Sequence, residues 1–123
     1  MLPSWRRPAI PPIPRQDNAG LHHQLPHRPA VYARGRRTLE KCICAGTTRM
    51  RTQVELDPVI GMRGFEGVQA LARDYAWAVD MEICVFPQEG LLNNPGTDEL
   101  LVEGLRRGAR VLGAAPYTNR PII

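Results

Sequence analysis

Three short segments combine side chains that could bind or activate a small molecule. Residues 53–57, 87–90 and 116–119 are rich in carboxylate, carboxamide and hydroxyl groups, and each follows an apolar or β-branched run. Parallel-strand folds collect their ligand-binding groups at the carboxyl ends of the strands. Because loops are polar in most proteins, one such segment alone would favour an ordinary loop. Because such a segment follows each of three apolar or β-branched runs, a ligand-binding site at the strand ends remains a candidate.

The histidines and cysteines are weaker candidates. His22, His23 and His27 lie in a proline-flanked stretch that lacks the scaffold and supporting contacts of a metal site, which favours a solvated tail. Cysteines occur at positions 42, 44 and 84, and an odd number without a secretion signal indicates reduced thiols and a cytoplasmic location. With the histidines confined to the tail, a Cys–His nucleophile pair is not expected.

The glycines of residues 61–67 resemble a phosphate-binding loop only in composition. This segment lacks both the G-x-G-x-x-G spacing and the lysine of a nucleotide-binding loop. These glycines are therefore expected to shape the turn into the following helix rather than to bind a dinucleotide.

Positive charge and proline are concentrated near the start of the chain. Residues 1–37 contain seven arginines and one aspartate, whereas residues 38–123 contain nine basic and eleven acidic residues. The formal charge of +4 therefore describes a tail, and a nucleic-acid-binding domain is not expected. No apolar run is long enough to span a membrane. Residues 1–32 are expected to form a disordered Pro/Arg-rich tail and residues 33–123 to fold.

Hydrophobic periodicity predicts alternating helices and strands in the folded part. Helices are expected over residues 36–45, 63–79 and 97–107, and strands over residues 47–56, 80–86 and 109–114. Thr97 is a candidate N-cap for the third helix. The αβαβαβ order predicts parallel neighbouring strands, either in an open doubly wound sheet or in part of a (β/α)₈ barrel. The chain is long enough for about three of the eight units of such a barrel.

Three motifs resemble cytosine-deaminase-like amidohydrolases. Residues 45–58 (AGTTRMRTQVELDP) are similar to the family's GTTxxRTxVDxDP segment, and residues 85–90 (VFPQEG) to its AFPQEG motif. Residues 100–116, which include GARVLGAAP, are similar to its LLxEALxxGADVVGGxP segment. The order and spacing of the motifs agree, and the resemblance covers about residues 33–119.

The resemblance implies a metal-dependent (β/α)₈ barrel that hydrolyses a C–N bond on a ring such as cytosine. A divalent metal, zinc or iron, would activate water in such an enzyme. The family's histidine and aspartate ligands match no position here, so no catalytic or metal-binding residue is assigned to this chain. Gln88 matches the family's ring-binding glutamine, whose carboxamide offers a donor and an acceptor together. Gln53 and Tyr117 stand where other members have histidine, which puts the identity of the ring in question.

These observations predict an α/β fold, namely a partial (β/α)₈ TIM-type barrel of about three parallel βα units with a disordered N-terminal tail. We expect a segment of an amidohydrolase that acts on a small cyclic amine or pyrimidine and is inactive by itself. Its exposed barrel edges would let copies of the chain associate. A non-catalytic α/β binding or assembly module is the alternative. No nucleic-acid or membrane partner is expected.

Overall fold

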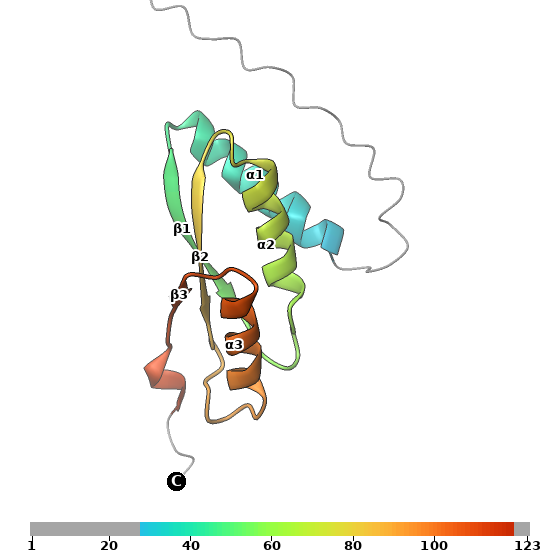
Figure 1. The fold of residues 1–123 in the computed structure, drawn as a ribbon, viewed down its shortest axis with the longest axis vertical. Helices are drawn as coiled ribbons and strands as arrows, with labels where there is room; N and C mark the ends of the chain where they lie inside the picture. Colours follow the sequence, from blue (N-terminus) through green and yellow to red (C-terminus); the bar gives the residue numbers. More distant parts are fainter. Residues whose placement is uncertain (1–27, 120–123) are drawn as a thin grey trace, which may run out of the picture.

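In the part of the chain that the structure describes, helices lie along one side of a small parallel sheet (Figure 1). The structure, a computed structural model, describes residues 28–119. In chain order its elements are α1 (Arg28–Cys44), β1 (Arg49–Glu55), α2 (Arg63–Asp74), β2 (Asp80–Phe86), α3 (Thr97–Arg106), β3 (Val111–Leu112) and a 3-10 helix, η2 (Pro116–Asn119). The strands form one sheet in the order β1-β2-β3, and both neighbouring pairs are parallel. The predicted αβαβαβ order is confirmed.

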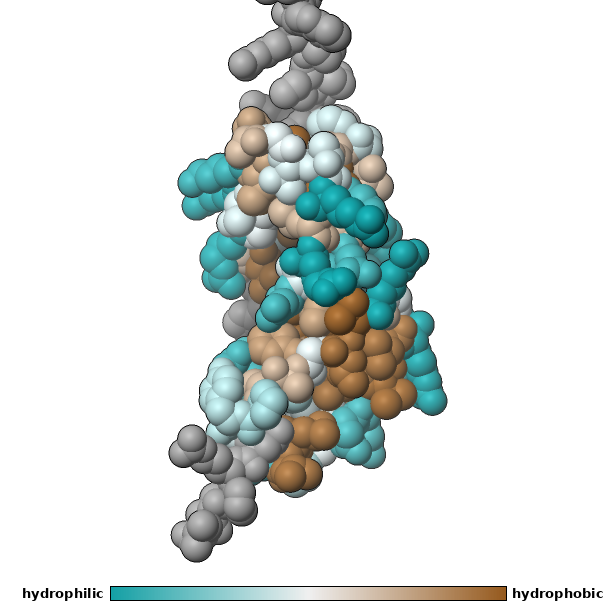
Figure 2. Space-filling view, turned by 90° about the vertical axis from the view of Figure 1, so that its left-hand side faces the viewer, coloured by the Kyte–Doolittle hydropathy of each residue, from teal (hydrophilic) through white to brown (hydrophobic). Residues whose placement is uncertain are grey.

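The other face of the sheet is open. Side chains of β1 alternate between sheltered and exposed positions, as expected when successive residues point to opposite faces. On β1 and β2, Arg49 pairs with Asp80 at 3.3 Å and Arg51 with Glu82 at 2.7 Å. Figure 2 views the molecule from this side. A hydrophobic patch lies in its lower half, which is the half that holds the carboxyl ends of the strands in Figure 1.

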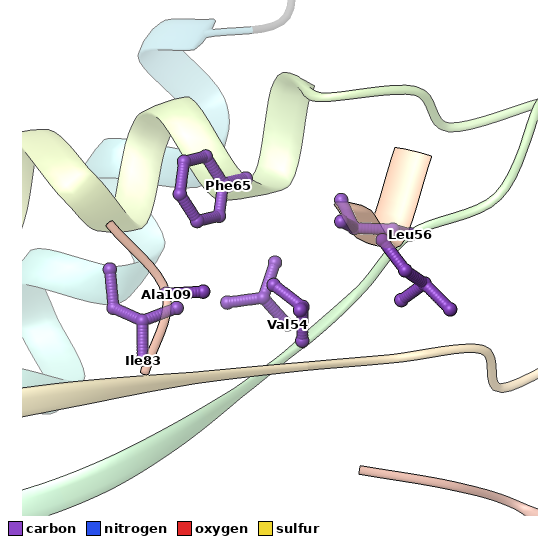
Figure 3. Packing of buried hydrophobic residues seen from close by; sticks show 7 residues of the cluster. Val54, Leu56, Phe65, Ile83 and Ala109 are labelled. Atoms are coloured by element: carbon purple, nitrogen blue, oxygen red, sulfur yellow. The ribbon is translucent and has the colours of Figure 1, made fainter. Parts of the chain in front are cut away.

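The main core lies between the sheet and helices α2 and α3. Its buried residues are Val54, Leu56, Phe65, Ile83, Val85, Leu101 and Ala109. Figure 3 shows Phe65 directed from α2 toward Val54 and Ile83 of the strands. Complete burial of a side chain such as that of Phe65 stabilises the fold by about 1.5–3 kcal/mol. This packing fixes the sheet that carries the polar strand ends.

A second apolar cluster joins α1 to α2. Its buried members are Leu39, Leu71, Tyr75 and Val79. The two helices approach closely at Gly67, where an added β-carbon would lie 2.9 Å from Val31 Cγ1. Contact between the helices therefore depends on a residue without a side chain at this position.

Helix α1 begins at Arg28, and the predicted start at Arg36 was wrong. Residues 28–32, which composition assigned to the tail, are helical, whereas residues 1–27 lie outside the described part. Pro29 is compatible with this start because the first N–H groups of a helix have no partner within it. Tyr32 donates a hydrogen bond to Asp74 of α2. This contact between the two helices stabilises a segment whose own hydrophobic periodicity is weak. No helix within residues 28–119 has the length and hydrophobicity needed to cross a membrane.

Two predicted ends of helices were also wrong. Helix α2 ends at Asp74 rather than Val79, because the Ala76 N–H donates to the Arg73 carbonyl, three residues back, at 3.4 Å, and this breaks the regular helical ladder after Tyr75. Thr97 does not cap α3. The N-cap is Gly96, whose φ of +94° suits glycine, and the Thr97 hydroxyl donates to the Asn94 carbonyl at 2.7 Å.

Strand β3 is shorter than the predicted range 109–114. Only Val111 and Leu112 pair with β2 in the regular ladder. Within residues 28–119, β3 has a neighbour on one side only, so just one row of hydrogen bonds holds it extended. The Gly113 N–H donates to the Val85 carbonyl at 2.8 Å, and the chain then continues into η2.

Candidate functional site

The carboxyl end of β2 presents Gln88 on a rigid turn. Pro87, which is buried, ends the strand, and the N–H of Gly90 donates to the Pro87 carbonyl at 3.1 Å. Gly90 has a φ of +92°, which a glycine adopts without strain. The Asn94 side chain donates to the carbonyls of Glu89 and Gly90 at 2.9 and 3.2 Å. The backbone on which Gln88 stands is therefore held by several hydrogen bonds.

Gln88 reaches the segment that follows β3. Its Nε2 donates a hydrogen bond to the Tyr117 hydroxyl at 3.1 Å. The Asn93 side chain donates to the Thr118 carbonyl, which makes a second link between the same two segments. Two of the three polar strand ends predicted from the sequence are thus brought together.

The third strand end, after β1, contributes carboxylates. Burial raises the pKa of the Glu55 carboxyl above its usual value, and the negative charges of Asp57 and Glu89 raise it further. The register pairs Glu55 with Phe86, two residues before Gln88, so the β1 and β2 ends are neighbours. Among the described residues, the three strand ends therefore form a single polar edge.

Asp57 has a structural role within this edge. It is only 5% exposed, and its Oδ1 accepts hydrogen bonds from the N–H groups of Val59 and Ile60 at 2.7 and 2.8 Å. This is the usual way in which an aspartate closes a turn after a strand. The Asp57 carboxylate is therefore used by the backbone of its own loop.

Gln53 lies apart from the Gln88–Tyr117 pair. It is exposed on β1, and the register pairs it with Cys84, which is buried. Cys42 is half-buried and Cys44 is exposed on α1, and all three cysteines are free thiols. The structure connects none of these side chains to Gln88 by a hydrogen bond within the described residues.

The described residues do not fit a catalytic metal. Residues 28–119 contain no group of three or more His, Cys, Asp or Glu side chains placed to hold an ion. The three histidines, for which a solvated tail rather than a metal site was expected, lie outside this range at His22, His23 and His27. At the acidic strand ends, two backbone N–H groups donate to Oδ1 of Asp57.

A cavity of about 330 Å³ opens at the amino ends of the strands, opposite the strand-end site. Its lining includes Arg49, Asp80 and Glu82, which take part in the ion pairs of the open face, together with Arg73 and Arg110. None of the polar residues at the strand ends lines it. The strand-end site is an exposed polar edge rather than part of this cavity.

The sequence motifs singled out Gln88 as a candidate but did not indicate that the Asn94 side chain holds its turn. Asn94 lies between the strand predicted over residues 80–86 and the helix predicted over residues 97–107, in a segment for which no contact was predicted. Asparagine side chains commonly bond to nearby backbone groups, and this property was the signal that could have suggested a clamp. The link between Gln88 and Tyr117 spans 29 positions of the chain and has no local signature.

The chain resembles several known proteins over part of their length. No protein-family model matches the chain. The uncharacterized protein YahJ of Escherichia coli (strain K12) is 30% identical over 120 residues, which are 94% of this chain and 25% of that protein. The structure of N-isopropylammelide isopropylaminohydrolase from Burkholderia multivorans ATCC 17616 is 42% identical over 58% of this chain and 18% of that enzyme, with a TM-score of 0.56.

A second solved structure extends the match. The 5-methylcytosine deaminase of Klebsiella pneumoniae is 28% identical, with a TM-score of 0.67 over 72% of this chain and 22% of that enzyme. The chain thus spans a quarter or less of the length of the relatives it matches. Its three parallel strands match part of an amidohydrolase barrel, which confirms the predicted fold class.

Both solved neighbours are hydrolases that act on C–N bonds. The likeness supports the amidohydrolase superfamily without selecting cytosine deaminase among its members. Amidohydrolase neighbours imply a divalent metal. The described residues supply no site for that metal.

Proposed function

We propose that this chain forms part of an amidohydrolase that hydrolyses an exocyclic C–N bond on a nitrogen-containing ring, such as that of cytosine. Within such an enzyme, residues 28–119 contribute to binding of the ring. The observation that carries the proposal is the position of Gln88, which stands at the carboxyl end of β2 on a turn held by Asn94. The similarity to two ring-acting hydrolases supports it.

The carboxamide of Gln88 is chemically suited to a ring edge. It carries two N–H donors and an oxygen acceptor in one plane, whereas a lactam-like ring edge offers a carbonyl beside an N–H. Two parallel hydrogen bonds between such groups fix the ring in orientation as well as in position. Loss of the carboxamide would leave the donor and acceptor of a bound ring unpaired, which costs about 1–3 kcal/mol.

The proposed role of Gln88 is limited to binding. Because the described residues do not fit a metal, no step that activates water is assigned to them. Glu55 and Glu89 give the edge a negative charge near the ring-binding position. Such an environment favours a neutral or cationic ring over an anionic one.

Replacement of Gln88 by alanine tests this proposal in a full-length relative, at the position that corresponds to Gln88. We expect kcat/KM to fall by about one to two decades while the metal content stays unchanged, because only contacts to the ring are lost. A matched control is the counterpart of Gln69→Ala. The Gln69 side chain bonds to the Arg107 carbonyl, so its loss should alter stability rather than kinetics. Parent-like kinetics in the Gln88 variant, or loss of its metal, would contradict the assignment.

A further inference from the structure

Tyr117 and Gln88 form a pair in which a second residue orients the carboxamide. The Tyr117 hydroxyl accepts a hydrogen bond from Gln88 Nε2 at 3.1 Å. The Tyr117 residue is 64% exposed, so the tyrosine is not held in place as a member of the core. The principal directional contact of its hydroxyl within the described residues is this bond to Gln88.

Both partners stand on segments with fixed backbones. The Gln88 turn is closed by the bond from Gly90 to Pro87. In η2, the N–H and hydroxyl of Thr118 both donate to the Ala115 carbonyl, at 3.1 and 2.7 Å. The tyrosine hydroxyl is therefore presented to the carboxamide from a backbone that is itself anchored.

We infer that Tyr117 is a positioning residue that sets the orientation of the Gln88 carboxamide for a ring. This inference rests on the proposed function. A free carboxamide can rotate and exchange its donor and acceptor edges. With one Nε2 hydrogen engaged by Tyr117, the second hydrogen and Oε1 remain for a ligand. The edge that remains pairs with a ring that presents a carbonyl beside an N–H, which is the substrate class we infer.

A purely structural role for Tyr117 leads to different expectations. The Asn93–Thr118 bond also joins the two segments, so a tie between them exists without the tyrosine hydroxyl. If the Tyr117 hydroxyl only held the two segments together, removal of either hydrogen bond would weaken ligand binding to the same extent. If it orients Gln88, only removal of the hydroxyl should weaken binding, and only while Gln88 is present.

The test uses the 123-residue chain labelled with ¹⁵N and titrated with cytosine, with affinity followed through amide resonances. Tyr117→Phe keeps the ring and removes only the hydroxyl. It should weaken cytosine binding about three- to tenfold, as expected for one hydrogen bond. Gln88→Ala should weaken binding at least tenfold. The double variant should bind no more weakly than Gln88→Ala alone, because a residue that acts through another shows such non-additivity.

Asn93→Ala is the matched control and should bind cytosine within about twofold of the unmodified chain. The Gln88 side-chain amide resonances should shift in Tyr117→Phe and stay in place in Asn93→Ala, even without cytosine. Unfolding midpoints should be similar for both variants because the two residues are exposed.

Three results would overturn the inference while the proposed function stands. They are unchanged affinity in Tyr117→Phe, additive losses in the double variant, and a loss in Asn93→Ala as large as that in Tyr117→Phe. Cytosine that moves no resonance of the unmodified chain would instead refute ring binding by this chain, and the inferred role of Tyr117 with it.

Discussion

At the scale of single residues, the polar side chains at the strand ends have different roles because they interact with different partners. Asp57 is buried and satisfies two N–H groups of its own loop. Gln88 is half-buried, and its Nε2 donates to the Tyr117 hydroxyl of another segment. Its Oε1 and its second N–H hydrogen remain available to a ligand. Glu55 has neighbours of like charge and a raised pKa. Residue type alone does not distinguish these roles, whereas the hydrogen-bond partners do.

The raised pKa of Glu55 predicts a pH-dependent stability. The folded chain binds a proton at Glu55 more readily than the unfolded chain does. The contribution of this group is therefore favourable below the unfolded pKa and is lost as pH rises through the folded pKa. Glu55→Gln should increase the free energy of unfolding near pH 7 by about 0.5 kcal/mol, the usual scale for a partly exposed site, with little effect at acidic pH. Urea unfolding at several pH values measures this.

Glu89→Gln provides a second variant for the same question. It removes one of the two negative charges that act on Glu55 and should move the pKa of that carboxyl toward its usual value. The gain near neutral pH should have the same sign as in Glu55→Gln and be smaller. Equal stability of Glu55→Gln and the unmodified chain at every pH would refute the electrostatic interpretation of this edge.

At the scale of elements, the α1–α2 pair shows how packing overrides local pattern. Helix α1 extends to Arg28 although the helix as a whole is weakly amphipathic. Tyr32 bonds to Asp74, and the Tyr75 hydroxyl donates to Glu40 at 2.6 Å. The bond from Tyr75, together with the Arg36 guanidinium, lowers the pKa of Glu40 below its usual value. Polar contacts at the rim thus supplement the apolar cluster between the helices.

Gly67→Ala should destabilise the fold although alanine favours helices by up to about 1 kcal/mol over glycine. The added β-carbon would lie 2.9 Å from Val31 Cγ1, on a stiff β-branched side chain, so the helices would have to separate. Overpacking of this kind costs about 1–3 kcal/mol, and we expect a net loss of about 1 kcal/mol. Urea unfolding of the purified variant measures this loss.

Gly64→Ala in the same helix is the matched control. Its β-carbon would lie 3.7 Å from Val54 Cγ1, an ordinary contact distance. This variant should be as stable as the unmodified chain or slightly more stable. If Gly67→Ala were equally harmless, the close approach of α1 and α2 would not be a determinant of the fold.

At the scale of the whole molecule, three βα units leave surfaces that a closed barrel would cover. β3 is an edge strand within the described residues, and Leu112 on it is 57% exposed. Val102 of α3 is 45% exposed. A sheet edge that is both unpaired and apolar favours association with another chain.

Leu112→Lys should therefore reduce self-association of the purified chain. A lysine on an edge strand opposes edge-to-edge pairing by charge and by the cost of desolvation. Sedimentation velocity over a range of concentrations should show a lower average mass than for the unmodified chain. Val59→Lys is the control, because Val59 is 82% exposed in the loop between β1 and α2 and away from the sheet edge. An equal effect of both variants would indicate a general charge effect rather than an edge contact.

Much of the architecture could be predicted from local patterns. The bounds of β2 and the start of α2 were predicted correctly, because a continuous apolar run and a single apolar stripe are strong short-range signals. The parallel order followed from the lengths of the crossovers. The position of Gln88 at a strand end followed from its place after Phe86 and Pro87.

Tertiary contacts were needed for the remaining features. The start of α1, the end of α2 and the two-residue length of β3 depend on neighbours that are distant in the chain, such as Asp74 for Tyr32. The same holds for the site, because Gln88 and Tyr117 meet only after the crossover through α3 brings β2 and β3 side by side. Periodicity records which face of an element is buried. It does not record which side chains from separate elements come within hydrogen-bonding distance, because that depends on how the elements pack.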